Sequence, residues 1–290
     1  MNGILLIDKP EGWTSMDVCA KLRRVLGERR VGHAGTLDPL ATGLLTVFLG
    51  RATRAVEFAE GDSKTYEATL RLGLVTDTQD VTGTVLETHS VDVTTEQLDA
   101  ALSKFRGDIL QIPPMYSALK VNGKKLYELA RKGREVERRP RPVTIHALDL
   151  TGRTENDVYL RVKCSKGTYI RSLCHDVGMA LGCGGTMAAL RRTAAGRFTV
   201  EQAHTLPEVL EAAEQGRADG LLLPVETLFD HRPVLTLSPA QTRVIRNGGA
   251  FTCAAAEGEY RLRAADGEFL ALGVVKDGSL RAVKSFFEVE

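Results

Sequence analysis

The sequence lacks the features of a membrane, secreted or metal-binding protein. No apolar run approaches the roughly 18 residues that a membrane span needs, and the short apolar segment 4–7 leads directly into Asp8 and Lys9, which does not fit a signal peptide. The 5 cysteines include no Cys-x-x-Cys pair, and the 6 histidines do not stand at zinc-ligand spacing from them. We therefore expect a cytoplasmic protein with reduced thiols and with neither membrane nor metal binding.

Composition and net charge do not single out a partner either. The 290 residues are 43% hydrophobic and 26% charged, and their net charge is +1, which describes an ordinary globular chain of about two domains. Basic residues are nevertheless concentrated between residues 120 and 141. They are Lys120, Lys124, Lys125, Arg131, Lys132, Arg134, Arg138, Arg139 and Arg141. Such a segment suits either contact with a phosphate backbone or an ordinary solvated helix and loop.

Hydrophobic periodicity predicts an α/β chain. Alternating or continuous apolar segments predict strands at residues 4–7, 44–49, 66–74 and 158–164. Apolar spacing and capping residues predict helices from Thr14 to about Leu26, from Thr94 or Thr95 onward, and over residues 170–181. Two long segments, 29–42 and 107–142, show no regular period, so we expect loops there, with one short helix near residues 126–132.

The character of the chain changes near Asp230. Short apolar segments beyond this point alternate with turn residues, and Asp277-Gly278 is a strong hairpin signal. We therefore place one domain at residues 1–230 and a small β-rich domain at residues 231–290. A piece of about 60 residues is near the lower limit for independent folding, so we expect it to lean on the larger domain.

The segment 29–42 holds the strongest candidate for chemistry. Its glycines permit tight turns and close approach to a ligand, and Pro39 restricts the backbone of Asp38 and so fixes its carboxylate. Such an aspartate suits a nucleophile, a general base or a ligand, but it is also typical of a plain Asp-Pro turn. His33 nearby suggests a hydrolase pair, yet no Gly-x-Ser-x-Gly elbow accompanies it. On these residues alone, both the catalyst and the turn remain open.

Several segments resemble, in the same order, the motifs of the bacterial tRNA pseudouridine-55 synthases, the TruB family. They are residues 2–10, 32–43, 64–80, 111–120, 164–171 and 190–193. The resemblance implies a pseudouridine synthase fold, α/β with a mixed, mainly antiparallel sheet. It also implies isomerisation of uridine-55 in the T-loop of tRNA, which involves no redox step and requires no cofactor. The last 60 or so residues are similar to the small β-barrel called a PUA domain, although a capping subdomain without RNA contact is the alternative.

The resemblance assigns three residues to the chemistry. Asp38 would be the catalytic aspartate, and Arg171 would pair with it and keep it ionised by lowering its pKa. Tyr66 would stack on the target base and assist removal of the proton at C5. Taken singly, Arg171 is equally a surface charge of a helix, and Tyr66 is equally a core residue of a strand.

Further residues would bind the extruded nucleotide. Tyr169 and Leu190 would line the uracil pocket, although both also suit a plain core. His33 would fill the place that the flipped base leaves, although an ordinary loop histidine is the simpler interpretation. Support around the pocket is expected from Lys9, Arg54 and Asp80.

The resemblance also favours RNA contact for the basic segment. Residues 107–142 would form an RNA-gripping insert whose contacts include Lys120, Lys124, Lys125, Arg138, Arg139 and Arg141. We expect the T-arm of tRNA as the partner, with no guide RNA and no obligate protein partner, because a stand-alone enzyme must grip its own substrate. A tRNA-folding factor with secondary chemistry is the main alternative, and a guide-RNA-dependent synthase is a third hypothesis.

Overall fold

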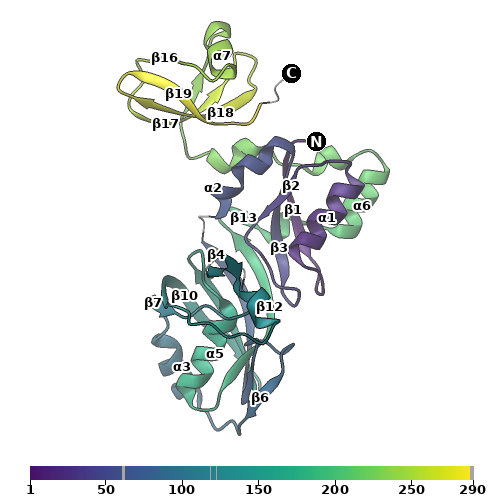
Figure 1. Ribbon diagram of the computed structural model, residues 1–290, viewed down its shortest axis with the longest axis vertical. Helices are drawn as coiled ribbons and strands as arrows, with labels where there is room; N and C mark the ends of the chain where they lie inside the picture. Colours follow the sequence, from purple (N-terminus) through teal and green to yellow (C-terminus); the bar gives the residue numbers. More distant parts are fainter. Residues whose placement is uncertain (61–62, 118, 122, 288–290) are drawn as a thin grey trace.

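A long mixed sheet dominates the protein (Figure 1). The structure is a computed structural model that describes residues 1–60, 63–117, 119–121 and 123–287, without the side chains of Glu60, Lys120 and Lys125. The strands of the sheet lie in the order β14 (His204–Thr205), β1 (Gly3–Lys9), β3 (Thr42–Leu49), β12 (Gly185–Ala195), β4 (Lys64–Leu72), β11 (Asp157–Cys164), β10 (Arg141–Arg153) and β7 (Gly107–Gln111), with β2 (Val31–Ala34) beside β3 and β13 (Phe198–Thr199) beside β12. The pairs β12–β3 and β1–β14 are parallel and the others antiparallel. The predicted mixed, mainly antiparallel sheet is confirmed.

Strand β4 shows how the sheet separates its two faces. Tyr66, Ala68 and Leu70 are buried, whereas Glu67 between them is exposed, as the period of two in a strand requires. The buried face packs against α5 (Ile170–Leu181), whose buried side chains belong to the same core cluster as Leu70. At Gly178 of α5 an added Cβ would lie 2.2 Å from the backbone nitrogen of the first residue of β12, so the helix rests directly on that strand.

The remaining elements lie around this sheet. The helices are α1 (Ser15–Val25), α2 (Val56–Glu60), α3 (Thr95–Ser103), α4 (Leu126–Ala130) and α6 (Leu206–Glu214), with 3-10 turns η1 (Gly50–Ala55), η2 (Val200–Gln202), η3 (Ala218–Leu221) and η4 (Val225–Phe229). Two small hairpins are formed by β5 (Leu74–Thr76) with β6 (Val85–Thr88), and by β8 (Lys120–Val121) with β9 (Lys124–Lys125). Figure 1 shows β12 running between an upper lobe with α1 and α6 and a lower lobe with α3 and α5. No helix in the described ranges is both long and apolar enough to cross a membrane.

The C-terminal part forms a separate curled sheet. Its strands lie in the order β15 (Val234–Thr236), β17 (Gly258–Arg263), β18 (Phe269–Lys276), β19 (Ser279–Ser285) and β16 (Ala250–Thr252), with α7 (Pro239–Arg246) at one end. Asp277 and Gly278 both have positive φ, 50° and 69°, which is the two-residue hairpin turn that the sequence predicts. The sheet is a half-barrel of the PUA-like type, so the predicted fold class is confirmed.

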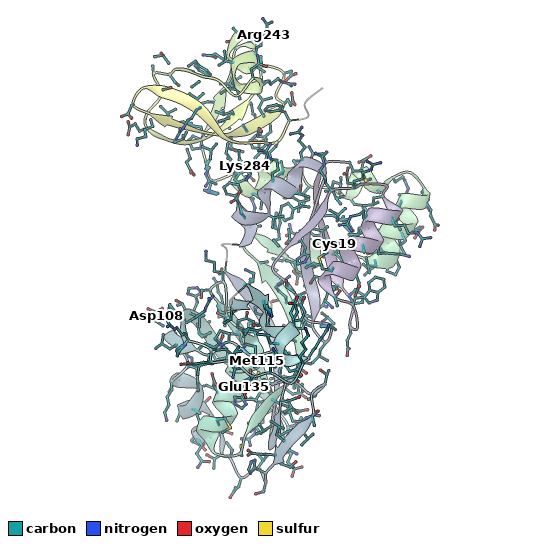
Figure 2. The ribbon with its side chains drawn as sticks, viewed as in Figure 1. Cys19, Asp108, Met115, Glu135, Arg243 and Lys284 are labelled. Atoms are coloured by element: carbon teal, nitrogen blue, oxygen red, sulfur yellow. The ribbon has the colours of Figure 1, made fainter. Side chains whose placement is uncertain are left out.

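An aromatic cluster joins the curled sheet to the upper lobe. Phe229 at the end of η4 is fully buried. The rings around it are those of Phe58, Phe269 and Phe286, with centroids 5.2, 6.1 and 5.8 Å away. Lys284, on the side of the curled sheet that faces the upper lobe in Figure 2, forms an ion pair with Glu57 of α2. The two parts therefore share an apolar contact that a charge pair borders.

Two of the expected loops contain strands. Residues 29–42 include β2, and residues 107–142 include β7 and the first residues of β10. Both β2 and β7 pair with a single neighbour, β3 and β10 respectively. Because most of β7 is exposed or half-buried on both faces, it has no apolar alternation for a sequence to reveal.

Candidate active site

Arg171, in the first turn of α5, lies at the centre of a buried charge cluster. Its side chain is 5% exposed, and its Nε lies 2.9 Å from Oδ2 of Asp38. Nη1 donates to the Thr78 carbonyl at 3.0 Å and lies 3.7 Å from Oδ2 of Asp80. Nη2 donates to the Tyr116 carbonyl at 2.7 Å. Through this one guanidinium, α5 is connected to three other segments, which are the loop after β2, the turn after β5 and the insert.

The loop that carries Asp38 is held from both sides. On one side, the Ser15 hydroxyl accepts from the Leu37 N–H at 2.9 Å and donates to the Leu37 carbonyl at 3.2 Å. On the other side, Gly43 has φ 94°, and an added Cβ would lie 2.3 Å from the Arg192 carbonyl oxygen. Only glycine fits this close approach of two backbones. Asp38 itself has a side chain that is 39% exposed, so its carboxylate is open to a ligand.

The pKa of Asp38 is raised above its ordinary value, mainly by burial. The charge of Arg171 opposes this shift, as the sequence led us to expect, and the charge of Lys9 also lowers the pKa of Asp38. The neighbouring charge of Asp80 adds to the increase. Arg171 thus lowers the pKa of Asp38 as expected, but removal of the carboxylate from water outweighs the attraction of the cation.

Lys9 and Asp80 both lie beside this pair. Lys9 is fully buried, and its Nζ donates to the carbonyls of Pro10, Trp13 and Pro39 at 2.8, 2.6 and 3.4 Å. Burial lowers the pKa of Lys9 to about 8. Through Pro39 this ammonium reaches the residue next to Asp38, so the predicted supporting position is consistent with the geometry.

Asp80 is held in the turn after β5. Its side chain is 7% exposed, and its Oδ1 accepts from the Thr78 hydroxyl and from the backbone and hydroxyl of Thr82 at 2.9, 3.0 and 2.5 Å. These bonds fix the second carboxylate that faces Arg171.

Both predicted tyrosines lie close to Asp38. The Asp38 charge is among the causes that raise the pKa of Tyr66 and of Tyr169, although burial is the largest cause for each. Tyr66 is 7% exposed on the α5 face of β4. Tyr169 precedes α5, and its backbone is bracketed by the Gln111 side chain, which accepts from the Tyr169 N–H at 2.8 Å and donates to its carbonyl at 3.0 Å.

Leu190 and His33 complete the predicted pocket residues. Leu190 is 9% exposed on β12 and pairs with Ala68, which places it on the same face of the sheet as Tyr66. His33 lies in β2, and its buried Nδ1 has no hydrogen-bond partner among the described residues. Burial, and then the charge of Arg192, lower the pKa of His33, so the ring is held towards its neutral form.

Arg54 does not belong to this cluster. It is exposed in η1, and its Nη1 donates to the Ser285 hydroxyl of β19 at 2.8 Å. The expectation that Arg54 supports the pocket is corrected, because the short turn that carries it faces the C-terminal sheet.

The insert presents its basic residues unequally. Lys124, Arg139 and Arg141 are exposed. Arg138 is turned back onto the insert, where it donates to the Pro113 carbonyl at 3.3 Å and pairs with Glu135 at 2.8 Å. The side chains of Lys120 and Lys125 lie outside the described part of the chain.

The comparisons with known proteins identify the family. Residues 23–170 match the N-terminal domain of the TruB family pseudouridylate synthases, and residues 171–230 match the tRNA pseudouridylate synthase B C-terminal domain. The chain belongs to the TruB family. It is 48% identical to tRNA pseudouridine synthase B of Azoarcus sp. (strain BH72), over 97% of this chain and 93% of that protein. It is 42% identical to the protein of the same name from Escherichia coli O1:K1 / APEC, over 96% and 92% of the two chains.

Solved structures show the same fold. A structure described as a Cbf5-Nop10-Gar1 complex matches with a TM-score of 0.75 and 27% identity, over 98% of this chain and 85% of that one. An H/ACA RNP bound to a substrate RNA containing 2'-deoxyuridine matches with a TM-score of 0.74 and 25% identity, over 99% and 85%. The prediction that the chain is a tRNA pseudouridine synthase, an isomerase, is confirmed at the level of the family.

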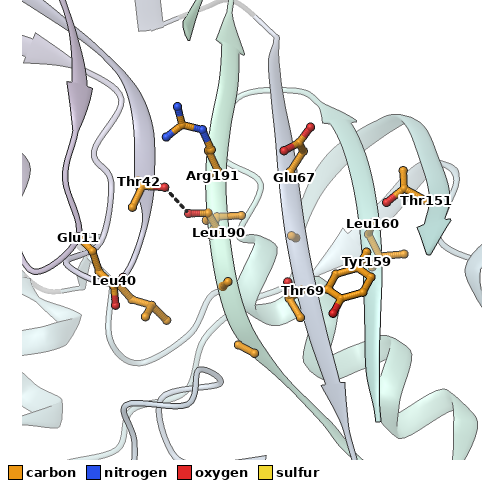
Figure 3. Close-up of a pocket in the computed structure, with 13 residues that line it drawn as sticks. Glu11, Leu40, Thr42, Glu67, Thr69, Thr151, Tyr159, Leu160, Leu190 and Arg191 are labelled. Atoms are coloured by element: carbon orange, nitrogen blue, oxygen red, sulfur yellow. Dashed lines mark hydrogen bonds between the residues drawn. The ribbon is translucent and has the colours of Figure 1, made fainter. Parts of the chain in front are cut away.

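A hollow in this TruB family member lies on the other face of the sheet. It measures about 360 Å³ and is lined by residues that include Glu67, Thr69, Tyr159 and Arg191 (Figure 3). Tyr159 pairs with Thr69, and Arg191 pairs with Glu67. Because Glu67 and Thr69 alternate with Tyr66 along β4, these side chains point to the face opposite that of Tyr66. Leu40, close to Asp38 in sequence, and Leu190 also line the hollow, so it borders the loop that carries Asp38.

Three residues that hold the site of this TruB family member were given no role from the sequence. Gln111 binds the backbone of Tyr169, and its only signal was its place in the TruB-like segment 111–120. Ser15 binds the backbone of Leu37 next to Asp38, and its sequence context does not distinguish it from a surface residue. Arg192 carried a signal, because it stands two positions after Leu190 and a strand places both on one face. Within the described ranges, His, Cys, Asp and Glu side chains nowhere gather in a group of three that could hold a metal ion.

Proposed function

We propose that the protein isomerises uridine-55 in the T-loop of tRNA to pseudouridine, without a guide RNA and without a cofactor. The observation that carries this proposal is the pair of Asp38, in the loop after β2, and Arg171, in α5, which lie 2.9 Å apart and near Tyr66 and Tyr169. A carboxylate open to a ligand and bound to a buried guanidinium is what the sugar chemistry requires. Membership of the TruB family supports the same conclusion.

The reaction moves one glycosidic bond. The bond between C1′ and N1 breaks, the uracil turns, C5 bonds to C1′, and the proton on C5 is released while N1 gains one. An ionised Asp38 supports three routes: attack on C1′, addition to the base, or abstraction of a sugar proton to give a glycal. In each route we propose that Tyr66 stacks on the base and that its hydroxyl assists transfer of the C5 proton.

The target base must leave its stack to reach Asp38. Extrusion costs a few kcal/mol, which new contacts have to offset. We propose that Tyr66, Tyr169 and Leu190 contact the flipped uracil, and that His33 stacks in the place it leaves. A neutral imidazole suits such stacking, and burial lowers the pKa of His33 in that direction.

We propose that residues 1–230 carry out the reaction and that residues 231–290 add RNA contacts as a PUA-like domain. The aromatic cluster around Phe229 supports a fixed placement of this domain against the catalytic part. The exposed Lys124, Arg139 and Arg141 support contact between the insert and the T-arm. A tRNA substrate is the reason we assign the enzyme to the cytoplasm.

The function is tested by tritium release from 5-tritiated uridine in a T-arm transcript. The purified protein alone is expected to release one tritium per transcript, and a transcript with cytidine at the target position is expected to release none. Binding without release would identify a tRNA-folding factor. Release that requires an added guide RNA would place the protein with the guide-dependent synthases.

Neutralising the basic insert is expected to weaken RNA binding and its salt dependence together. The triple variant Arg138→Gln, Arg139→Gln and Arg141→Gln should make the slope of log K against log salt less negative by about 2, because the exposed Arg139 and Arg141 can each release counterions by a phosphate contact, whereas Arg138 is turned back onto the insert. Titration of a labelled T-arm at several salt concentrations measures the slope. The control is Arg71→Gln, which breaks an exposed pair with Asp157 outside the insert. Equal slopes for both variants would place RNA contact elsewhere.

A further inference from the structure

Arg192 is a buried cation without an acidic partner. Its side chain is 1% exposed and is among the largest fully buried side chains of the protein. Its Nε and Nη2 donate to backbone carbonyls, its buried Nη1 has no hydrogen-bond partner among the described residues, and none of their carboxylates pairs with it. Burying a charge without a counter-charge is costly. A side chain that filled this space without a charge would avoid that cost, so the guanidinium calls for an explanation.

The contacts of Arg192 lie on both sides of the loop that carries Asp38. Nη2 donates to the carbonyl of Gly35, the first residue of the loop, at 2.9 Å, and Nε donates to the carbonyl of Leu44, in β3 just after the loop, at 2.7 Å. Nη1 lies 3.2 Å from where a Cβ on Gly35 would be. A planar guanidinium can bind two carbonyls in fixed directions at once. The two ends of the loop are therefore joined through one rigid group.

The same side chain faces the residues that surround the reaction. In the sheet, Arg192 pairs with Tyr66 on β4 and with Gly43 on β3. Its positive charge lowers the pKa values of Tyr66, His33 and Lys9. Since coulombic effects fall with distance, Arg192 lies close to a proposed base contact, a proposed wedge and a support of the Asp38 loop.

We propose that Arg192 is a positioning residue for the isomerisation. Its side chain joins both ends of the Asp38 loop to β12, the strand beside Tyr66, and so fixes the carboxylate of Asp38 relative to the target base. The proposal rests on the proposed function, since the reaction is what it positions. Arg192 itself is enclosed by protein and acts through Asp38 and Tyr66. Its loss should therefore slow the chemical step more than it weakens RNA binding.

Arg191 provides a matched control in the same strand. It points to the opposite face, is 39% exposed, and pairs with Asp8 at 2.7 Å. Both arginines have the same charge and neighbouring positions, and only Arg192 contacts the Asp38 loop. Arg191→Met should therefore leave the rate within about threefold of wild type, as expected for a partly exposed pair.

The test compares R192M, R192K and R191M by single-turnover tritium release, T-arm affinity and thermal unfolding. R192M should lose about 100-fold in rate, because displacement of a reacting group by about 1 Å has this effect, with the dissociation constant within about threefold. R192K retains the charge, but a lysine cannot span both carbonyls. Its rate should lie between those of R192M and wild type.

Each outcome decides the point. An R192M protein that folds and reacts at the wild-type rate, or whose rate falls only in proportion to its RNA affinity, overturns the positioning role. If R192M does not fold, R192K carries the test, and a wild-type rate for R192K overturns the joining of the two loop ends. A wild-type protein that releases no tritium contradicts the proposed function instead, so the two failures are distinguishable.

Discussion

Asp38→Asn is expected to reduce tritium release from the T-arm to background, a loss of roughly 10⁴-fold or more, as for other residues that act on the reacting atoms. Asparagine has nearly the same size, and its carbonyl oxygen can still accept from Arg171, which now lies 2.9 Å from the carboxylate. The variant cannot attack C1′, add to the base or abstract a sugar proton, because each route needs the ionised oxygen. RNA affinity should stay within about threefold of wild type.

Asp8→Asn is the control for this loss. Asp8 is also a carboxylate paired with an arginine of the catalytic part, Arg191 at 2.7 Å, and it lies outside the Asp38 cluster. Its replacement should leave the single-turnover rate within about threefold of wild type. If Asp38→Asn still releases tritium at a rate close to that of Asp8→Asn, the carboxylate of Asp38 does not carry the reaction.

The sequence was informative wherever a local rule determined the structure. Strand β4 alternates because one face is buried, and α5 ends at Gly182, whose φ of 78° closes the helix. The approach of Asp38 to Arg171 could not come from such rules, since the two residues belong to distant segments. It came from the resemblance to the TruB family, and the distance of 2.9 Å agrees with it.

Other parts of the fold depend on contacts that a single sequence does not display. Strand β12 mixes alanines, threonines and arginines. Its register against β4 shifts between Met187 and Ala189 and again between Arg192 and Ala194. These bulges interrupt the alternation that would reveal a strand. The direction of the Asp38 pKa shift depends on the whole fold for a similar reason, because burial is the largest cause and the Arg171 charge, which the sequence predicts, is only one contribution.

Arg171→Met is expected to damage both stability and activity. It leaves the buried Asp80 without its cation and removes the donor to the Thr78 and Tyr116 carbonyls. Removing one partner of a buried pair costs about 3–5 kcal/mol of unfolding free energy, mostly through Asp80, because Asp38 is 39% exposed and can regain water. Denaturant unfolding measures the loss. The loss should shrink as pH falls, because the folded-state pKa of Asp38 is raised and Arg171 opposes that shift, so that the variant binds a proton at Asp38 more readily when folded.

Replacing Arg171 and replacing Asp80 should shift the pH dependence of the rate in opposite directions. Arg171 lowers the pKa of Asp38, and Asp80 raises it. The reaction requires the ionised carboxylate, so the rate falls as pH drops through this pKa. Arg171→Met should therefore move the acid limb of the single-turnover rate to higher pH, and Asp80→Asn should move it to lower pH. Limbs that move in the same direction, or not at all, would mean that the acid limb reports a group other than Asp38.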